Sequence, residues 1–201
     1  MGITPLQFRK LQDRLKATRV AKPAVEAGLR PLARSHRVVL GIDPSLRGTG
    51  YGIIRGGRPA PTLVTCGTIH CPAGWDHSRC LLNILQTLRG VLKQHQPEVC
   101  VIEGLFFAQN LQTALIMGEA RGAAIAAVAE AGLEIFEIAP RKMKQAIVGY
   151  GAAQKLAVAK MVQRMLSLPA LPEPDAADAL ALALTHSQEQ GRYSLTPPKR
   201  V

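Results

Sequence analysis

Residues 38–54 read VVLGIDPSLRGTGYGII, and this stretch decides the fold of the chain. An apolar run leads to a single carboxylate, Asp43, and a turn containing proline and glycine leads into a second apolar run. The pattern predicts two strands joined by a tight turn, with Asp43 at the end of the first strand. An aspartate before a turn is most often only a turn former. A functional reading of Asp43 therefore requires partners elsewhere in the chain.

The pattern around this stretch predicts an α/β domain. We expect strands at 37–43, 50–55, 62–70, 99–103 and 133–138, and helices at 76–95, 110–131, 153–166 and 175–187. Strand, helix and strand in succession imply a parallel crossover. The prediction is a five-stranded mixed sheet flanked by helices, over residues 37–188. A basic extension with a linker (1–36) precedes it, and a flexible tail (189–201) follows.

Composition narrows the class of protein. The 201 residues are 47% hydrophobic and 19% charged, with a net charge of +11. No apolar run reaches the roughly 18 residues of a membrane span, so no membrane partner is expected. A basic balance favours a polyanion such as nucleic acid. The four cysteines form no zinc or C-x-x-C spacing and no signal peptide is visible, which predicts a cytoplasmic protein. The basic N-terminus leaves an organelle transit peptide as the alternative.

Three further acids are candidate partners of Asp43. Glu103 ends the apolar run at 99–102, and Asp175 and Asp178 open the last helix with an i, i+3 spacing that puts both on one face. An aspartate in a first turn also caps a helix, which is the structural alternative. Four converging carboxylates would repel one another unless a cation neutralised them, and this donor set suits Mg²⁺ or Mn²⁺. Two such ions about 3.5–4 Å apart support phosphodiester hydrolysis.

Several motifs in order give a resemblance to a family. They are GIDP (41–44) with TGYG (49–52), VIE (101–103), EARG (119–122), KQ (144–145) before VGYGA (148–152), and DAADALA (175–181) with TH (185–186). Residues 38–188 resemble the RuvC family of crossover junction endodeoxyribonucleases, which resolve Holliday junctions. The resemblance implies an RNase H-like fold, a homodimer, and paired symmetric nicks in four-way junction DNA during recombination and repair.

The resemblance also implies a metal site. It makes Asp43, Glu103, Asp175 and Asp178 the metal-binding catalytic tetrad, with two Mg²⁺ per subunit and Mn²⁺ as a substitute. In the cell such enzymes work with the RuvA–RuvB branch-migration complex. Two features depart from the family pattern: SLRG at 45–48 stands where many members have Gly-Ser-Arg, and the extension 1–36 lies outside the pattern.

DNA contacts are implied for four residues. Phe106 matches an aromatic residue that stacks on bases, and Lys144, Lys155 and Arg141 match or neighbour basic residues near the scissile phosphate, with Lys144 also catalytic. The structural alternatives are that Phe106 or Phe107 fills the core and that the basic side chains are solvated. His186 is interpreted as a helix-end histidine rather than a metal ligand.

Other functions remain open from the sequence. The stretch around Asp43, with Thr49 and several glycines, also resembles the phosphate loop of actin-like and sugar-kinase-type ATPases. Those proteins need a second phosphate loop, which the chain lacks. A non-catalytic module that binds DNA structures is a third reading, and a nuclease that acts on RNA or on flaps is a fourth.

Overall fold

A mixed six-stranded sheet forms the centre of the fold. The computed structural model describes residues 36–104, 111–190 and 199–201. The strands are β1 (Val38–Asp43), β2 (Gly48–Arg55), β3 (Thr62–His70), β4 (Val99–Glu103), β5 (Glu134–Ile138) and β6 (Lys199–Arg200). Their order in the sheet is β3-β2-β1-β4-β5-β6. β1, β4 and β5 are parallel, whereas the outer pairs are antiparallel.

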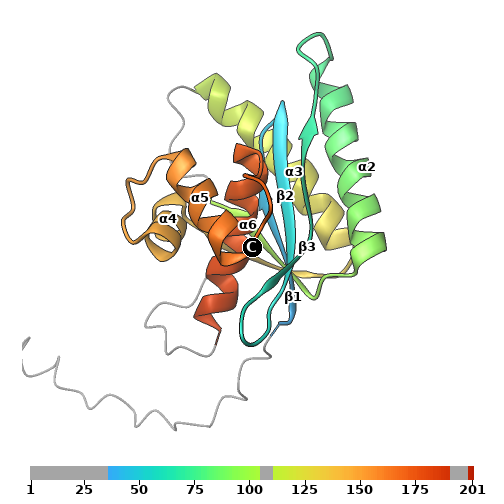
Figure 1. Ribbon diagram of the computed structural model, residues 1–201. Coiled ribbons are helices and arrows are strands. Elements are labelled where there is room, and N and C mark those ends of the chain that lie inside the picture. The colour runs from blue at the N-terminus through green and yellow to red at the C-terminus, as the bar shows by residue number, and fades with distance from the viewer. Residues whose placement is uncertain (1–35, 105–110, 191–198) are drawn as a thin grey trace, which may run out of the picture. The chain divides into compact units, whose positions relative to one another are not determined.

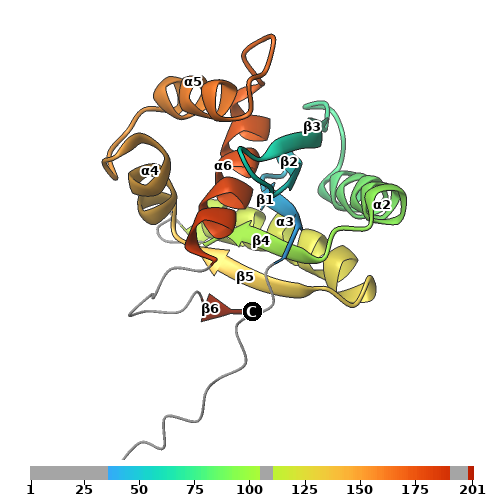
Figure 2. The same ribbon diagram turned by 60° about the horizontal axis from the view of Figure 1, so that its bottom comes forward.

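Helices cover both faces of the sheet (Figures 1 and 2). α2 (His77–His95) and α3 (Leu111–Glu130) pack on one face, against a core that includes Leu40, Ile42 and Ile102. α4 (Pro140–Val148), α5 (Lys155–Met165) and α6 (Pro174–Glu189) lie on the other face, over Val39 and Val101. Alternate residues of each central strand thus point into different cores. The α/β class and the mixed sheet expected from the sequence are confirmed.

α6 is the helix closest to the sheet. Residues 176–186 are all buried. A Cβ at Gly41 would overlap the carbonyl oxygen of Ala179, and one at Gly50 would overlap that of Asp175. Because both strand positions lack a side chain, the backbone of the helix rests directly on β1 and β2. This close approach fixes the start of α6 relative to the ends of these strands.

Two elements differ from the expectation. α4 was not predicted, because its nine residues form only about two and a half turns and bury just Met143 and Ile147, too few positions to establish an apolar period in the sequence. Its start and end signals were present, since Pro140 occupies the first turn and Gly149 ends the helix with a φ of 99°. β6 adds a sixth strand, because Lys199 and Arg200 lie within the segment expected to be a flexible tail but pair with the edge of β5.

Some expectations lie outside the described residues. They include nearly all of the basic extension, residues 1–35, and most of the tail, residues 191–198. The four cysteines are free, in keeping with the expectation of no disulfide framework. Among the described helices, none combines the length and apolarity needed to cross a membrane.

Candidate active site

Two of the four predicted acids lie at the ends of neighbouring parallel strands. Asp43 is the last residue of β1 and Glu103 the last of β4, and the preceding residues Ile42 and Ile102 are paired in register. Ile42 and Ile102 face α2 and α3, so the two acids point to the opposite face, on which α6 lies. Each of the two carboxyl groups shifts the pKa of the other, so their side chains lie close together. The parallel pairing therefore brings Asp43 and Glu103 together.

The other two acids come from the start of α6. Asp175 is in its first turn, and Asp178 follows one turn later and is only 4% exposed. Asp175 lies over β2, where its Oδ2 would be 2.8 Å from a Cβ at Gly48. Neither aspartate occupies the N-cap position, which is Glu173, and the Glu173 side chain makes no capping hydrogen bond. The charges of Asp175 and Asp178 act on Asp43, so all four acids belong to one electrostatic cluster.

Burial disfavours the charged forms of these acids. It is the main cause that raises the pKa of Glu103 to about 8, followed by the charge of Asp43. Burial likewise raises the pKa of Asp43 to about 6, with the charge of Asp178 as the next cause. The pKa of Asp178 is also raised, chiefly by burial. The raised pKa values show that burial and mutual repulsion destabilise the negative charge of these acids. Nearby positive charge compensates for this only in part.

One ammonium group supplies part of the positive charge that the four acids require. Lys155, the first residue of α5, places Nζ 3.2 Å from Asp175 Oδ1 and 3.4 Å from Asp178 Oδ2. Burial opposes its charge, but the two aspartates outweigh burial and raise the pKa of Lys155 above its ordinary value. The other oxygen of Asp178, Oδ1, is buried and has no hydrogen-bond partner. Among the described residues, Lys155 is thus the cation paired with this cluster, and it contacts two of the four carboxylates.

The donor chemistry of this cluster fits a hard divalent cation. All four groups are carboxylates, which are the preferred ligands of Mg²⁺ and Mn²⁺, and the buried unpartnered oxygen of Asp178 is a vacant donor. Among the described residues, no group of three or more His, Cys, Asp or Glu side chains converges closely enough to hold an ion as it stands. The acids therefore gather without forming a finished cage.

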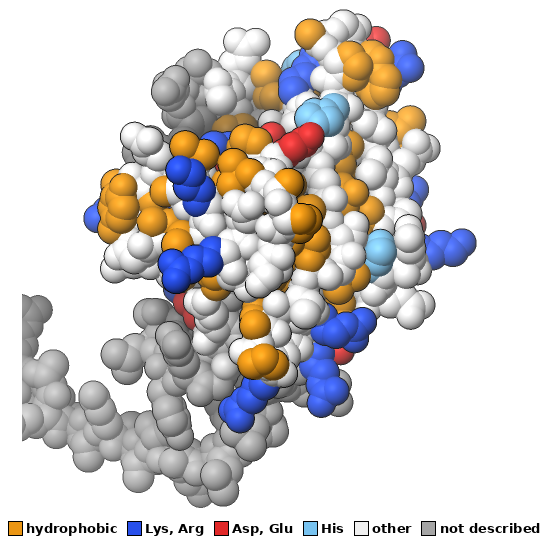
Figure 3. Space-filling model, in the orientation of Figure 1, with side chains coloured by type: hydrophobic (Ala, Val, Ile, Leu, Met, Phe, Trp, Pro, Cys, Tyr) orange, Lys and Arg blue, Asp and Glu red, His pale blue; other side chains and the backbone are white. Residues whose placement is uncertain are grey.

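Basic residues of α4 flank the acids. The charge of Lys144 lowers the pKa of Asp178 against the effect of burial, which places Lys144 near the cluster. Arg141, Lys142 and Lys144 line a cavity of about 780 Å³ at this helix. Lys142 is held by Glu189, 2.8 Å away, whereas Arg141 packs under Gly151. Lys and Arg side chains also spread over the face shown in Figure 3, where acids appear only in small areas.

The remaining predicted residues have different outcomes. Phe106 and Phe107 lie outside the described residues. His186 is eight residues beyond Asp178 on α6, about 12 Å along the helix axis. It stacks on Phe136 and lies 3.3 Å from Nδ1 of His36, far from the acids. The position of His186 therefore agrees with its interpretation as a helix-end histidine.

A supporting residue next to Asp43 was missed from the sequence. Arg47 donates to the carbonyl oxygens of Pro72 (2.6 Å) and Trp75 (3.1 Å), so it ties the turn after Asp43 to the start of α2. Within the same turn, the Thr49 hydroxyl donates to the Ser45 carbonyl oxygen at 2.6 Å. The sequence showed Arg47 only as part of a turn that departs from the family pattern. Its partners are distant in the chain and become visible only in the fold.

Comparisons with known proteins agree on one family. The profile described as "Crossover junction endodeoxyribonuclease RuvC" matches residues 39–186. Crossover junction endodeoxyribonuclease RuvC of Akkermansia muciniphila is 43% identical over 148 residues, covering 74% of this chain and 89% of that protein. The corresponding protein of Alkalilimnicola ehrlichii is 46% identical with the same coverage. T. thermophilus RuvC, solved in complex with a Holliday junction substrate, superposes with a TM-score of 0.70 at 34% identity, over 76% of this chain and 93% of that one.

Proposed function

The chain belongs to the RuvC family of crossover junction endodeoxyribonucleases, and from this we infer how its residues cleave a Holliday junction. The family membership, with the RNase H-like fold, makes the protein a hydrolase of phosphodiester bonds in junction DNA. Membership of this family argues against two alternatives raised from the sequence, an ATPase and a non-catalytic DNA-binding module. What we propose concerns the residues, the metal, the partners and the place in the cell.

We propose that Asp43, Glu103, Asp175 and Asp178 hold the divalent cations, two Mg²⁺ per subunit with Mn²⁺ as a substitute. The buried, unpartnered Oδ1 of Asp178 carries this proposal, because an uncompensated buried oxygen needs a cation or a donor. When bound, such ions supply an activated water and stabilise the leaving oxygen. The strand ends hold Asp43 and Glu103 in place, and the start of α6 brings the two other acids to them.

The basic residues act on the DNA in this proposal. Lys155 lies beside Asp175 and Asp178, so its ammonium is available to a phosphate that reaches the acids. Lys144 and Arg141, which line the cavity at α4, bind the backbone of the junction. Lys144 additionally stabilises negative charge that develops at the scissile phosphate. Phe106, five residues before α3, stacks on a base at the junction.

Two copies are needed for symmetric nicks, so we propose a homodimer. Leu82 of α2 and Leu111 and Leu115 of α3 are exposed by 50–76%, on helices that share one face of the sheet. These leucines on two neighbouring helices are the apolar side chains that we propose the second copy covers. We also propose the RuvA–RuvB complex as a partner and the cytoplasm as the site of action, as expected from the family.

A cleavage assay tests the assignment of the site. A labelled four-way junction is incubated with Mg²⁺ and the protein, in parallel with Asp43→Asn and with Asp76→Asn as a matched control outside the cluster. We expect paired nicks from the wild type and from Asp76→Asn, and none from Asp43→Asn, although that variant still binds the junction. Equal cleavage of a linear duplex would contradict junction specificity, and full activity of Asp43→Asn would overturn the assignment of the acids.

A further inference from the structure

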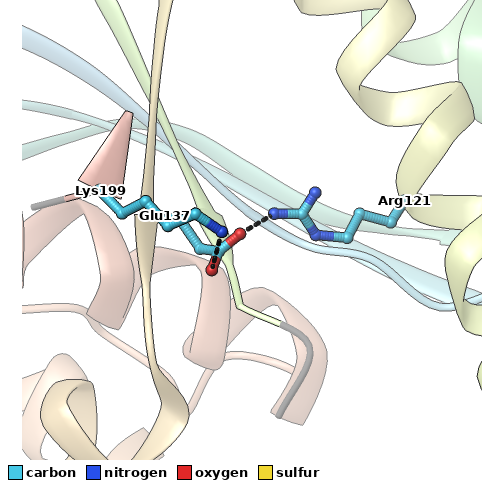
Figure 4. Close-up of polar contacts among 3 residues, drawn as sticks. All are labelled: Arg121, Glu137 and Lys199. Carbon is cyan, nitrogen blue, oxygen red and sulfur yellow. Dashed lines mark hydrogen bonds and ion pairs between the residues drawn. The ribbon is translucent and has the colours of Figure 1, made fainter. Parts of the chain in front are cut away.

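A second charged cluster lies on the other face of the sheet, directly behind the strand end that carries Glu103. Glu137 of β5 is paired in register with Ile102 and, like Ile135, faces α3. Its carboxylate forms an ion pair with Arg121 of α3. Both side chains are largely buried, with 10% of Arg121 and 19% of Glu137 exposed. Figure 4 shows the Glu137 carboxylate between Arg121 and Lys199.

Glu137 also packs on the residue that follows Glu103. A Cβ at Gly104 would lie 3.1 Å from Cγ and 3.2 Å from Oε1 of Glu137, so the side chain of Glu137 occupies the space behind Gly104. The Gly104 amide donates to the carbonyl oxygen of Ile138 at 2.9 Å, which extends the β4–β5 ladder by one residue. The backbone just after Glu103 is thus held by a hydrogen bond along the sheet and by a side chain from behind.

Arg121 fixes the conformation of Glu137 in turn. The guanidinium reaches Oε2, and Lys199 Nζ lies 3.4 Å from Oε1, so both carboxylate oxygens have a cation. Lys199 is 74% exposed and screened by solvent, which makes the buried Arg121 the stronger partner. A charged hydrogen bond in a buried setting restricts the rotamer of Glu137 and therefore the contact with Gly104.

We propose that the Arg121–Glu137 pair is a positioning device that sets the end of β4, and with it the Glu103 carboxylate. Within the part of the chain that the structure describes, the contacts of the pair do not include the four acids; the pair acts through Gly104. The proposal rests on the function inferred above, because it assigns Glu103 to the metal site. Displacing a catalytic group by about 1 Å costs on the order of 100-fold in rate, so a small shift at Gly104 has a measurable result.

Two variants test the contact from its two sides. Glu137→Ala empties the space behind Gly104, and Gly104→Ala pushes a methyl group into the Glu137 side chain. We expect Glu137→Ala to lower kcat for junction cleavage by up to roughly 100-fold and Gly104→Ala to lower it by a smaller factor, with KM changed less than about twofold in both. We also expect the affinity for Mn²⁺, measured by titration calorimetry, to fall about tenfold, as for other residues that orient metal ligands. Glu137→Gln, which keeps the size and shape of the side chain behind Gly104, should retain most of the wild-type kcat and Mn²⁺ affinity.

The double variant distinguishes positioning from general damage. In Glu137→Ala with Gly104→Ala, the new methyl group occupies part of the emptied space, so the double variant should be more active than the product of the two single effects predicts. Glu134→Ala is the matched control, because Glu134 lies on the same strand and pairs with Arg200 at the protein surface. It should leave kcat and Mn²⁺ affinity within about twofold of the wild type.

The outcomes separate this proposal from the assigned function. Glu137→Ala that folds with wild-type kcat and Mn²⁺ affinity would overturn the positioning role, as would additive effects in the double variant. If Glu137→Ala does not fold, Glu137→Gln and Gly104→Ala are compared alone, and an unaltered Gly104→Ala is the contradicting result. A wild type that binds Mn²⁺ but cuts no junction would refute the assigned function and leave the Mn²⁺ comparison valid.

Discussion

Two clusters of buried charge lie back to back across the end of the sheet, and they are compensated differently. On the α3 face, Glu137 has a cation at each oxygen. On the α6 face, Asp43, Glu103, Asp175 and Asp178 share Lys155, and one oxygen of Asp178 has no partner. A compensated pair serves the structure, whereas an uncompensated cluster of one sign is a place for ligands. Variants that add or remove charge should therefore have opposite effects in the two clusters.

The largest effect is expected for activity on the α6 face. Asp178→Asn should reduce single-turnover cleavage by more than about 10³-fold, because a metal ligand supports several kcal/mol of transition-state stabilisation. The same variant should not destabilise the metal-free protein, since burial already raises the pKa of Asp178 and favours its neutral form. Cleavage kinetics and thermal unfolding measure the two effects. If Asp178→Asn lost both its fold and its activity, the proposed difference between the two clusters would be wrong.

On the α3 face we expect a large loss of folding stability. Arg121→Met leaves Glu137 buried without its main partner, which should lower the free energy of unfolding by about 3 kcal/mol. Replacing both residues, as Arg121→Met with Glu137→Gln, removes the uncompensated charge and should recover most of the loss. Urea unfolding provides the values. A double variant as unstable as the single one would mean that lost packing, not charge, causes the effect.

The pH dependence of stability should also differ. The pKa of Glu103 rises from 4.5 in the unfolded chain to about 8 in the fold, so the folded state binds more protons between these values. The contribution of Glu103 to the stability of the metal-free protein is therefore fully present below pH 4.5 and is lost as pH rises through 8, by a few kcal/mol in all. We expect Glu103→Gln to abolish this loss between pH 6.5 and 8. An unchanged slope in that variant would contradict the assignment.

His186 sets the lower limit of that pH window. Burial, followed by the charge of His36, lowers its pKa from 6.5 to about 4. The unfolded chain then binds more protons between these values, so stability is lost as pH falls from 6.5 to 4. Above pH 6.5 this contribution is constant, which is why the test of Glu103 begins there.

The smallest effect concerns Lys155. Its ammonium lies within 3.4 Å of two acids and repels an incoming cation, so Lys155→Ala should bind Mn²⁺ about tenfold more tightly than the wild type. Lys160→Ala, which removes an exposed lysine of the same helix, should bind Mn²⁺ as the wild type does. Calorimetry of the two variants decides the point. Weaker binding by Lys155→Ala would show that the lysine supports the metal site.

The sequence predicted the acids better than their surroundings. Apolar runs that end in Asp43 and Glu103 mark strand ends by local pattern alone, and the i, i+3 spacing of Asp175 and Asp178 fixes their helix face. The pairing of Arg121 with Glu137 depends on how α3 packs on β5, which no local pattern encodes. The same holds for Lys155, whose contact with the acids depends on the packing of α5 against α6. The ion pairs of both clusters therefore depend on tertiary packing and could not be predicted from local sequence patterns.

The close seat of α6 on Gly41 and Gly50 has a consequence for synthesis of the chain. The strands that carry Asp43 and Glu103 leave the ribosome early, whereas Asp175 and Asp178 follow only after α5. Under the proposed assignment of the metal site, a nascent chain that lacks α6 holds only two of the four acids. α6 is synthesised late and must pack against the backbone at Gly41 and Gly50 before the four acids come together. We therefore expect nuclease activity only after the domain has folded.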